Sequence, residues 1–107
     1  MNIFDIYIAY VTWGSGGKKR PVLILEQTAG GVTVFNITTR YEGKSEIIRS
    51  NYFKINDWQE AGLHQQSYVD TNRTVTLPLS SVDVAHPVGT LTESDVRKFI
   101  EFIEDKQ

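Results

Sequence analysis

The feature that most constrains the fold is a series of short runs rich in β-branched and aromatic residues. Glycines separate these runs, and one helical segment follows the last of them. Val, Ile, Thr, Tyr and Phe suit the pleated surface of a strand, and glycine or proline clusters between such runs indicate turns. We expect strands at 5–11, 21–26, 32–37 and 67–77, with a short one at 46–49. Many short strands followed by one helix predict a small barrel or half-barrel.

The clearest local prediction is a helix near the C-terminus. Residues 92–95, Thr-Glu-Ser-Asp, have the spacing of a capping box. The apolar residues that follow recur at helical spacing and mark one face: Val96, Phe99, Ile100 and Ile103. We expect this helix to end near Glu104 and to lie on the barrel.

The segment between the first two expected strands is the strongest candidate site on composition. Residues 14–17 hold three glycines, and Lys18, Lys19 and Arg20 follow them. Glycine allows a close approach of backbone to ligand, and a guanidinium matches the geometry of phosphate. We expect a flexible loop here, with Pro21 at the start of the next strand because proline cannot donate a ladder hydrogen bond. An ordinary solvated loop is the alternative.

A second group joins Arg20 to Thr38. Residues 29–31 are typical of a hairpin turn, so the strands at 21–26 and 32–37 should pair in antiparallel fashion. Arg20 precedes the first strand and Thr38 ends the second, so the pairing places both at the same end. The Thr38 hydroxyl could then donate to a phosphate oxygen beside Arg20. The alternative is that Thr38 and Thr39 are ordinary β-branched strand residues.

Composition narrows the classes of function. The chain of 107 residues suits a single domain spanning 1–107. The absence of cysteine excludes disulfides and thiolate metal sites, and two histidines without clustered carboxylates predict neither a metal site nor a cofactor. No apolar run is long enough to span a membrane and no signal peptide begins the chain, so we expect a cytoplasmic protein without membrane contact.

Charge is distributed unevenly along the chain. The formal net charge of -2 argues against a general nucleic-acid coat protein. From Thr12 to Arg49, however, six basic residues stand against three acidic ones. One part of the surface is therefore expected to attract phosphate.

Taken together, these motifs resemble the MazF/PemK toxins of bacterial toxin–antitoxin pairs. The matching segments are Phe4–Tyr7, Gly16–Leu25, Phe35–Thr39, Asp57–Leu63, Ser67–Val69, Arg73–Leu77 and Val88–Thr92. They cover nearly the whole chain, and their order and spacing carry the resemblance more than any one of them. At Thr71-Asn72-Arg73 the chain departs from the family, which often has Gln or Asp two residues before the arginine.

The resemblance implies an SH3-like barrel of the CcdB/MazF type and a homodimer. It also implies an endoribonuclease that cuts single-stranded RNA selectively, without a metal ion, to a 2′,3′-cyclic phosphate and a 5′-hydroxyl, and that a cognate antitoxin neutralises. The arginine and threonine on which the family depends match Arg20 and Thr38, which we predict to be catalytic. The residues predicted to bind RNA are Trp13, Lys18, Lys19, Thr39, Arg40 and Arg73.

Two other functions fit the same barrel. A CcdB-like toxin that inhibits gyrase would act through C-terminal residues and would not need Arg20 or Thr38. A catalytically inactive SH3-like interaction module would present an aromatic groove, made from Trp13, Tyr41 or Trp58. The two histidines, His64 and His86, are expected to be plain polar residues in loops. Cleavage of naked RNA separates the first hypothesis from the other two.

Overall fold

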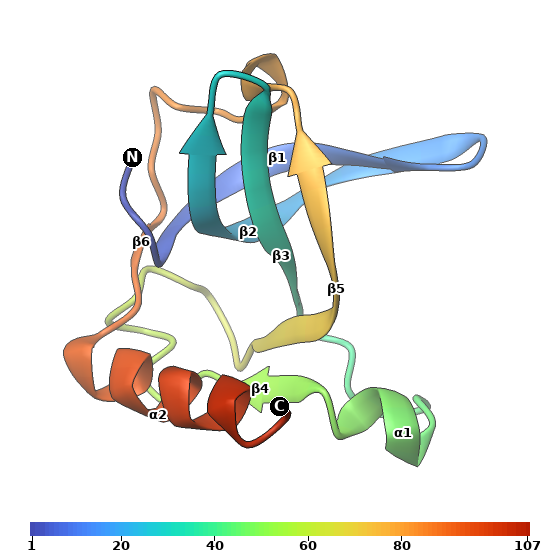
Figure 1. The fold of residues 1–107 in the computed structure, drawn as a ribbon, viewed down its shortest axis with the longest axis vertical. Helices are drawn as coiled ribbons and strands as arrows, with labels where there is room; N and C mark the ends of the chain where they lie inside the picture. The colour runs from blue at the N-terminus through green and yellow to red at the C-terminus, as the bar shows by residue number, and fades with distance from the viewer.

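Six strands form one antiparallel sheet, in the order β4-β5-β3-β2-β1-β6, in the computed structural model, which describes residues 1–107. The strands are β1 (Asp5–Trp13), β2 (Gly16–Thr28), β3 (Gly31–Thr38), β4 (Tyr52–Lys54), β5 (Tyr68–Leu77) and β6 (Gly89–Thr90). The helices are α1 (Glu46–Arg49), the short 3-10 helix η1 (Leu79–Ser81) and α2 (Glu93–Glu104). The sheet curls and α2 packs across its lower end (Figure 1), so the predicted mainly β half-barrel with a C-terminal helix is confirmed.

The first hairpin is longer than the sequence predicted. β1 and β2 pair from Ile6 opposite Leu23 out to Trp13 opposite Gly16, so residues 16–20 are strand and not loop. Beyond the body of the sheet they form a two-stranded arm (Figure 1). Pro21 lies inside β2 and not at its start. It is tolerated because the pairing of β3 with β2 begins only at Val22, which leaves this part of β2 with one neighbouring strand.

The arm is a strand pair because its glycines make room for aromatic side chains. A Cβ on Gly17 would lie 2.9 Å from the Tyr10 ring, and one on Gly16 would lie 3.3 Å from Trp13 Nε1. Rings that cover glycines on a neighbouring strand supply the packing that glycine lacks. The glycine-rich run was therefore wrongly predicted as a loop.

The segment at 46–49 is a short helix, α1, and the predicted strand there is wrong. Ser45 caps it, because its hydroxyl accepts a hydrogen bond from the Ile48 amide at 3.3 Å. The neighbouring strand, β4, begins only at Tyr52. The turn at residues 29–30, the strand at 32–37 and the extended segment that Pro78 ends are confirmed.

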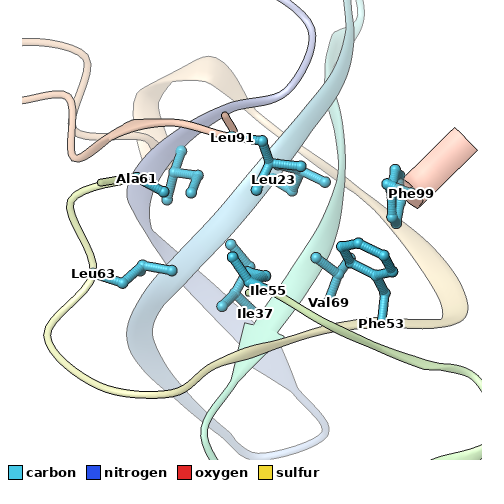
Figure 2. Packing of buried hydrophobic residues seen from close by; sticks show 10 residues of the cluster. Leu23, Ile37, Phe53, Ile55, Ala61, Leu63, Val69, Leu91 and Phe99 are labelled. Atoms are coloured by element: carbon cyan, nitrogen blue, oxygen red, sulfur yellow. The ribbon is translucent and has the colours of Figure 1, made fainter. Parts of the chain in front are cut away.

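One hydrophobic core fills the space between the sheet and α2. Figure 2 shows its side chains, which come from the first five strands, the chain after β4, the residue Leu91 before α2, and α2 itself. Phe99 of α2 meets the rings of Phe4, Phe35 and Phe53 edge-on, with centroids 5.1 to 6.2 Å apart. Ile100, predicted on this apolar face, is 44% exposed, while Phe102 packs against the core in its place.

The start of α2 is anchored as the capping box predicts. Thr92 Oγ1 accepts a hydrogen bond from the Asp95 amide. The Asp95 carboxylate is fully buried and accepts hydrogen bonds from the amides of Asn56 and Asp57, at 3.3 and 2.8 Å. The cap therefore also fixes the loop after β4. No helix is long and apolar enough to cross a membrane.

A second core lies on the other face of the sheet. Its members come mainly from β1, β2 and β3: Tyr7, Ala9, Val11, Val22, Ile24, Val32, Val34, Leu77 and Val82. Successive side chains of a strand point to opposite faces, so the two cores take alternate residues of the same strands. Where this second core ends, the same face becomes polar.

Candidate functional site

The polar part of this face is built by strand alternation and register. Asn36 of β3 lies opposite Asp70 of β5, and Asp70 in turn lies opposite Tyr52 of β4. On the other side of β3, Asn36 pairs with Val22, and Arg20 stands two residues before Val22 on β2. Residues directly opposite each other in an antiparallel pair share a face, as do residues two apart on one strand. These polar side chains therefore project together.

They line a hollow of about 430 Å³, called the basic hollow from here on. Thr38, at the end of β3, also lines it, so the structure brings together the two residues predicted to be catalytic. Thr38 Oγ1 accepts a hydrogen bond from the Arg40 amide at 3.1 Å, which leaves the hydroxyl proton free to be donated. Among the residues predicted to bind RNA, Trp13, Lys18, Arg40 and Arg73 line the same hollow.

The basic hollow has a strong excess of positive charge, although the chain as a whole is acidic at -2. Its five cationic residues are Lys18, Arg20, Arg40, Lys44 and Arg73. The only acidic residue in the lining is Asp70. None of the five cations takes part in an ion pair within the chain. Their charge is therefore available to an anionic ligand.

Arg20 lines the basic hollow, and one nitrogen of its side chain has no hydrogen-bond partner. Its guanidinium lies 5.9 Å from the centroid of the Trp13 ring, and Trp13 itself is 48% exposed. Arg20 Nε and Asn36 Oδ1 are buried without a hydrogen-bond partner. An unpaired buried polar group costs about 1–3 kcal/mol, and most buried polar groups in proteins have a partner. These two atoms therefore have hydrogen-bonding capacity that no other group of the chain uses.

Six lining residues were not predicted from the sequence: Val11, Thr12, Asn36, Lys44, Tyr52 and Asp70. Asp70 Oδ1 accepts hydrogen bonds from the Asn72 amide and the Asn72 side chain, at 2.9 and 2.8 Å. Burial raises the pKa of the Tyr52 phenol above its ordinary value of 10.0, and the negative charge of Asp70 raises it further, while Arg20 opposes both. Asp70 is the one carboxylate of β5, and this is the signal in the sequence that could have identified it.

Lys19 and Thr39, two further residues predicted to bind RNA, do not line the basic hollow. Lys19 lies opposite Tyr10 in the arm and faces a different hollow beside it. Both residues border a small cleft of about 170 Å³ where β2 and β3 separate. Thr39 also lines a hollow of about 580 Å³ that shares Arg40 and Lys44 with the basic hollow. The two hollows are therefore neighbours that share these two cations.

The histidines lie elsewhere. His64 and His86 are exposed, and neither lines any of the hollows described above. His86 Nδ1 lies 3.1 Å from a carboxylate oxygen of Asp83. No group of three or more His, Asp or Glu residues is arranged to hold a metal ion. The polar chemistry of the basic hollow is thus that of guanidinium, ammonium, hydroxyl, amide and one carboxylate.

Comparison with known proteins points to one family. No protein-family model and no curated protein sequence matches the chain. Among solved structures, the Mycobacterium tuberculosis toxin MazF-mt6 is similar to it with a TM-score of 0.70 and 28% sequence identity. The match covers 94% of this chain and 93% of that one. The similarity therefore extends over nearly the whole length of both chains.

Proposed function

We propose that this chain, which is similar in fold and sequence to the toxin MazF-mt6, is a MazF-like toxin and an endoribonuclease that cuts single-stranded RNA at selected sequences. The observation that carries this proposal is the meeting of Arg20 and Thr38 in a hollow with four further cations and one carboxylate. A phosphodiester is the ligand whose charge and geometry fit such a lining, since guanidinium groups bind phosphate oxygens in a planar fork.

In the proposed reaction the RNA supplies its own nucleophile. The 2′-oxygen forms a bond to the neighbouring phosphorus and the bond from phosphorus to the 5′-oxygen breaks, which leaves a 2′,3′-cyclic phosphate and a 5′-hydroxyl. Arg20 neutralises the charge that grows on the phosphate oxygens, and the Thr38 hydroxyl donates a hydrogen bond to one of them. Both groups act by electrostatics and positioning, so the proposed reaction requires no metal ion.

The proton of the attacking 2′-hydroxyl needs an acceptor. An arginine is unsuitable because its pKa is above about 12, and the two histidines do not line the basic hollow. Asp70 is the only carboxylate in the lining, and Asn72 holds one of its oxygens at 2.8 and 2.9 Å. We therefore assign the role of general base to Asp70.

The RNA on either side of the cut is proposed to follow the cations. Lys18, Arg40 and Arg73 bind flanking phosphates, and the neighbouring hollow beside Thr39 receives the next nucleotide. Trp13 is exposed at the end of the arm and offers a face for base stacking. Selectivity among RNA sequences would come from these contacts with bases.

The proposal also includes two protein partners: a second copy of the chain in a homodimer, and a cognate antitoxin. An apolar hollow of about 320 Å³ lies between the sheet and α2, with Phe35, Ile100 and Ile103 in its lining. Exposed apolar surface of this kind is typical of protein interfaces. The cytoplasm, where RNA and an antitoxin would be met, is the proposed location.

Incubation of the purified protein with a long single-stranded RNA in EDTA tests the proposed activity. We expect discrete fragments with cyclic-phosphate ends, and for Arg20→Ala a rate about 100- to 1,000-fold lower, as for the loss of one donor to a developing oxyanion. Arg97→Ala is the matched control, because Arg97 is exposed on α2 and pairs only with Glu93. RNA that stays intact over many sequences would refute the proposal.

The two alternative functions predict other results in that assay. A CcdB-like gyrase inhibitor or an inactive SH3-like module would leave RNA intact. The aromatic residues considered for a groove do not share one: Trp13 lies in the arm, Tyr41 stacks on Tyr68 and Trp58 packs against the first core. These three residues therefore do not form the single aromatic groove that the interaction-module hypothesis expected.

A further inference from the structure

The Tyr52 side chain lines the basic hollow beside the proposed base, Asp70. We propose that the Tyr52 hydroxyl is the general acid that protonates the 5′-oxygen as its bond to phosphorus breaks. This inference rests on the proposed ribonuclease function and names a catalytic residue for it. Three observations support it: the position of Tyr52 in the sheet, the packing of its ring and the state of its hydroxyl.

The sheet register puts Tyr52 beside the proposed base. Tyr52 of β4 lies directly opposite Asp70 of β5, and Asp70 lies directly opposite Asn36 of β3. All three line the basic hollow with Arg20 and Thr38. A tyrosine side chain is longer than an aspartate, so the two polar groups stand at different distances from the sheet backbone. The two groups can therefore serve different oxygens of one phosphodiester.

The ring of Tyr52 is held while its hydroxyl stays available. The residue is only 8% exposed, and its ring centroid lies 6.2 Å from that of Tyr41 and 6.3 Å from that of Tyr68. Tyr41 and Tyr68 are themselves stacked at 4.6 Å, so the three rings brace one another. The Tyr52 hydroxyl makes no hydrogen bond within the chain. The shorter side chains of Asn36 and Asp70 lie beside it in the same row across the sheet. A fixed ring with a free hydroxyl is the arrangement that a positioned acid requires.

The electrostatic surroundings favour a protonated phenol. Burial raises the pKa of Tyr52 and the charge of Asp70 raises it further, so the hydroxyl carries its proton at neutral pH. Tyr52 therefore acts as a proton donor and not as the base. Arg20 lies close enough to oppose this shift, and it stabilises the tyrosinate that exists briefly after the transfer.

Asp70 and Tyr52 together account for every proton that moves in the proposed reaction. As the 2′-oxygen bonds to phosphorus, its proton passes to Asp70. As the bond from phosphorus to the 5′-oxygen breaks, the Tyr52 proton passes to that oxygen and makes the 5′-hydroxyl. Protonated Asp70 then returns a proton to the tyrosinate opposite it across the β4–β5 ladder, which restores both groups. No oxidant, metal or further reactant is needed.

A change of leaving group tests this role directly. Two RNA substrates are compared, one with the natural 5′-oxygen at the cut and one with a 5′-bridging sulfur, whose thiolate leaves without a proton because thiols are far more acidic than alcohols. We expect Tyr52→Phe to slow cleavage of the oxygen substrate about 100- to 10,000-fold, the range typical of general acids. The same variant should cleave the sulfur substrate about as fast as the unaltered protein.

Two controls accompany this comparison. Tyr10→Phe removes a hydroxyl on the other face of the arm and should cleave both substrates normally. Thermal unfolding of Tyr52→Phe should match that of the unaltered protein, since the ring contacts remain and no hydrogen bond is lost.

The outcomes separate this inference from the proposed function. Equal slowing of both substrates by Tyr52→Phe, or no slowing of the oxygen substrate, would overturn the assignment while the ribonuclease activity stands. If the unaltered protein cuts neither substrate, the proposed function fails, and this inference fails with it.

Discussion

Two adjacent lysines in the arm provide a sharp test of the proposed RNA path. Lys18 and Lys19 are both exposed and differ by one position in β2, so their side chains point to opposite faces of the arm. Lys18 lies opposite Val11 and lines the basic hollow, while Lys19 lies opposite Tyr10 and lines only the hollow beside the arm and the small cleft next to Thr39. Replacing either one by alanine removes the same charge from the same strand. Only the direction of the side chain differs.

The magnitude follows from the number of cations in the hollow. For a single strand, the logarithm of the binding constant falls with the logarithm of salt concentration by about 0.7 per phosphate neutralised. Five unpaired cations line the basic hollow, so contacts by all five give a slope of about -3.5. Affinity should then fall about 100-fold between roughly 50 and 200 mM salt. Lys18→Ala should reduce the slope by about 0.7, and Lys19→Ala should change it much less.

The assay measures binding without cleavage. Fluorescence anisotropy is recorded with an RNA whose 2′-oxygens are all methylated, because the proposed reaction cannot then begin. The titration is repeated at several salt concentrations for the unaltered protein and for the two alanine variants. Equal changes of slope for Lys18→Ala and Lys19→Ala would refute the idea that one face of the sheet carries the RNA. A slope near zero for the unaltered protein would refute phosphate binding altogether.

Two further predictions concern stability and the histidines. Asp95→Ala should lower the free energy of unfolding by about 3 kcal/mol, because the amides of Asn56 and Asp57 lose their buried carboxylate partner; an unchanged midpoint in urea unfolding would contradict this. His64→Ala and His86→Ala should keep most of the RNA-cutting activity, since neither residue lines the basic hollow, and a 1,000-fold loss in either, measured with the assay in EDTA, would show that a histidine transfers the proton.

The arm between β1 and β2 shows how local composition misled the prediction. Glycine disfavours strands when it is judged alone, so residues 14–20 were predicted as a loop. In the fold, Tyr10 and Trp13 cover Gly17 and Gly16 across the strand pair. The glycines form a strand only because the aromatic residues of β1 lie across from them. Which residues lie across from each other depends on the register of β1 and β2.

Other parts of the fold are determined by residues that are close together in the sequence. The cap at Thr92 and the helix that follows depend on residues within one or two turns of each other, and the structure confirms them. The hairpin between β2 and β3 depends on a turn at 29–30 with apolar runs on both sides, and it too is confirmed. Such features need only neighbouring residues, so the sequence predicts them well.

For the candidate site, the sequence by itself determined that Arg20 and Thr38 would meet, because one hairpin connects them and its turn could be recognised. Only the tertiary structure decided that Asp70 and Tyr52 join them, since β4 and β5 are separated from that hairpin along the chain and reach it through sheet pairing. The tertiary structure also decided that Lys18 faces the basic hollow while Lys19 does not. The physical reason is the two-residue period of a strand: a shift of one position in register reverses every side chain, and composition carries no information about register.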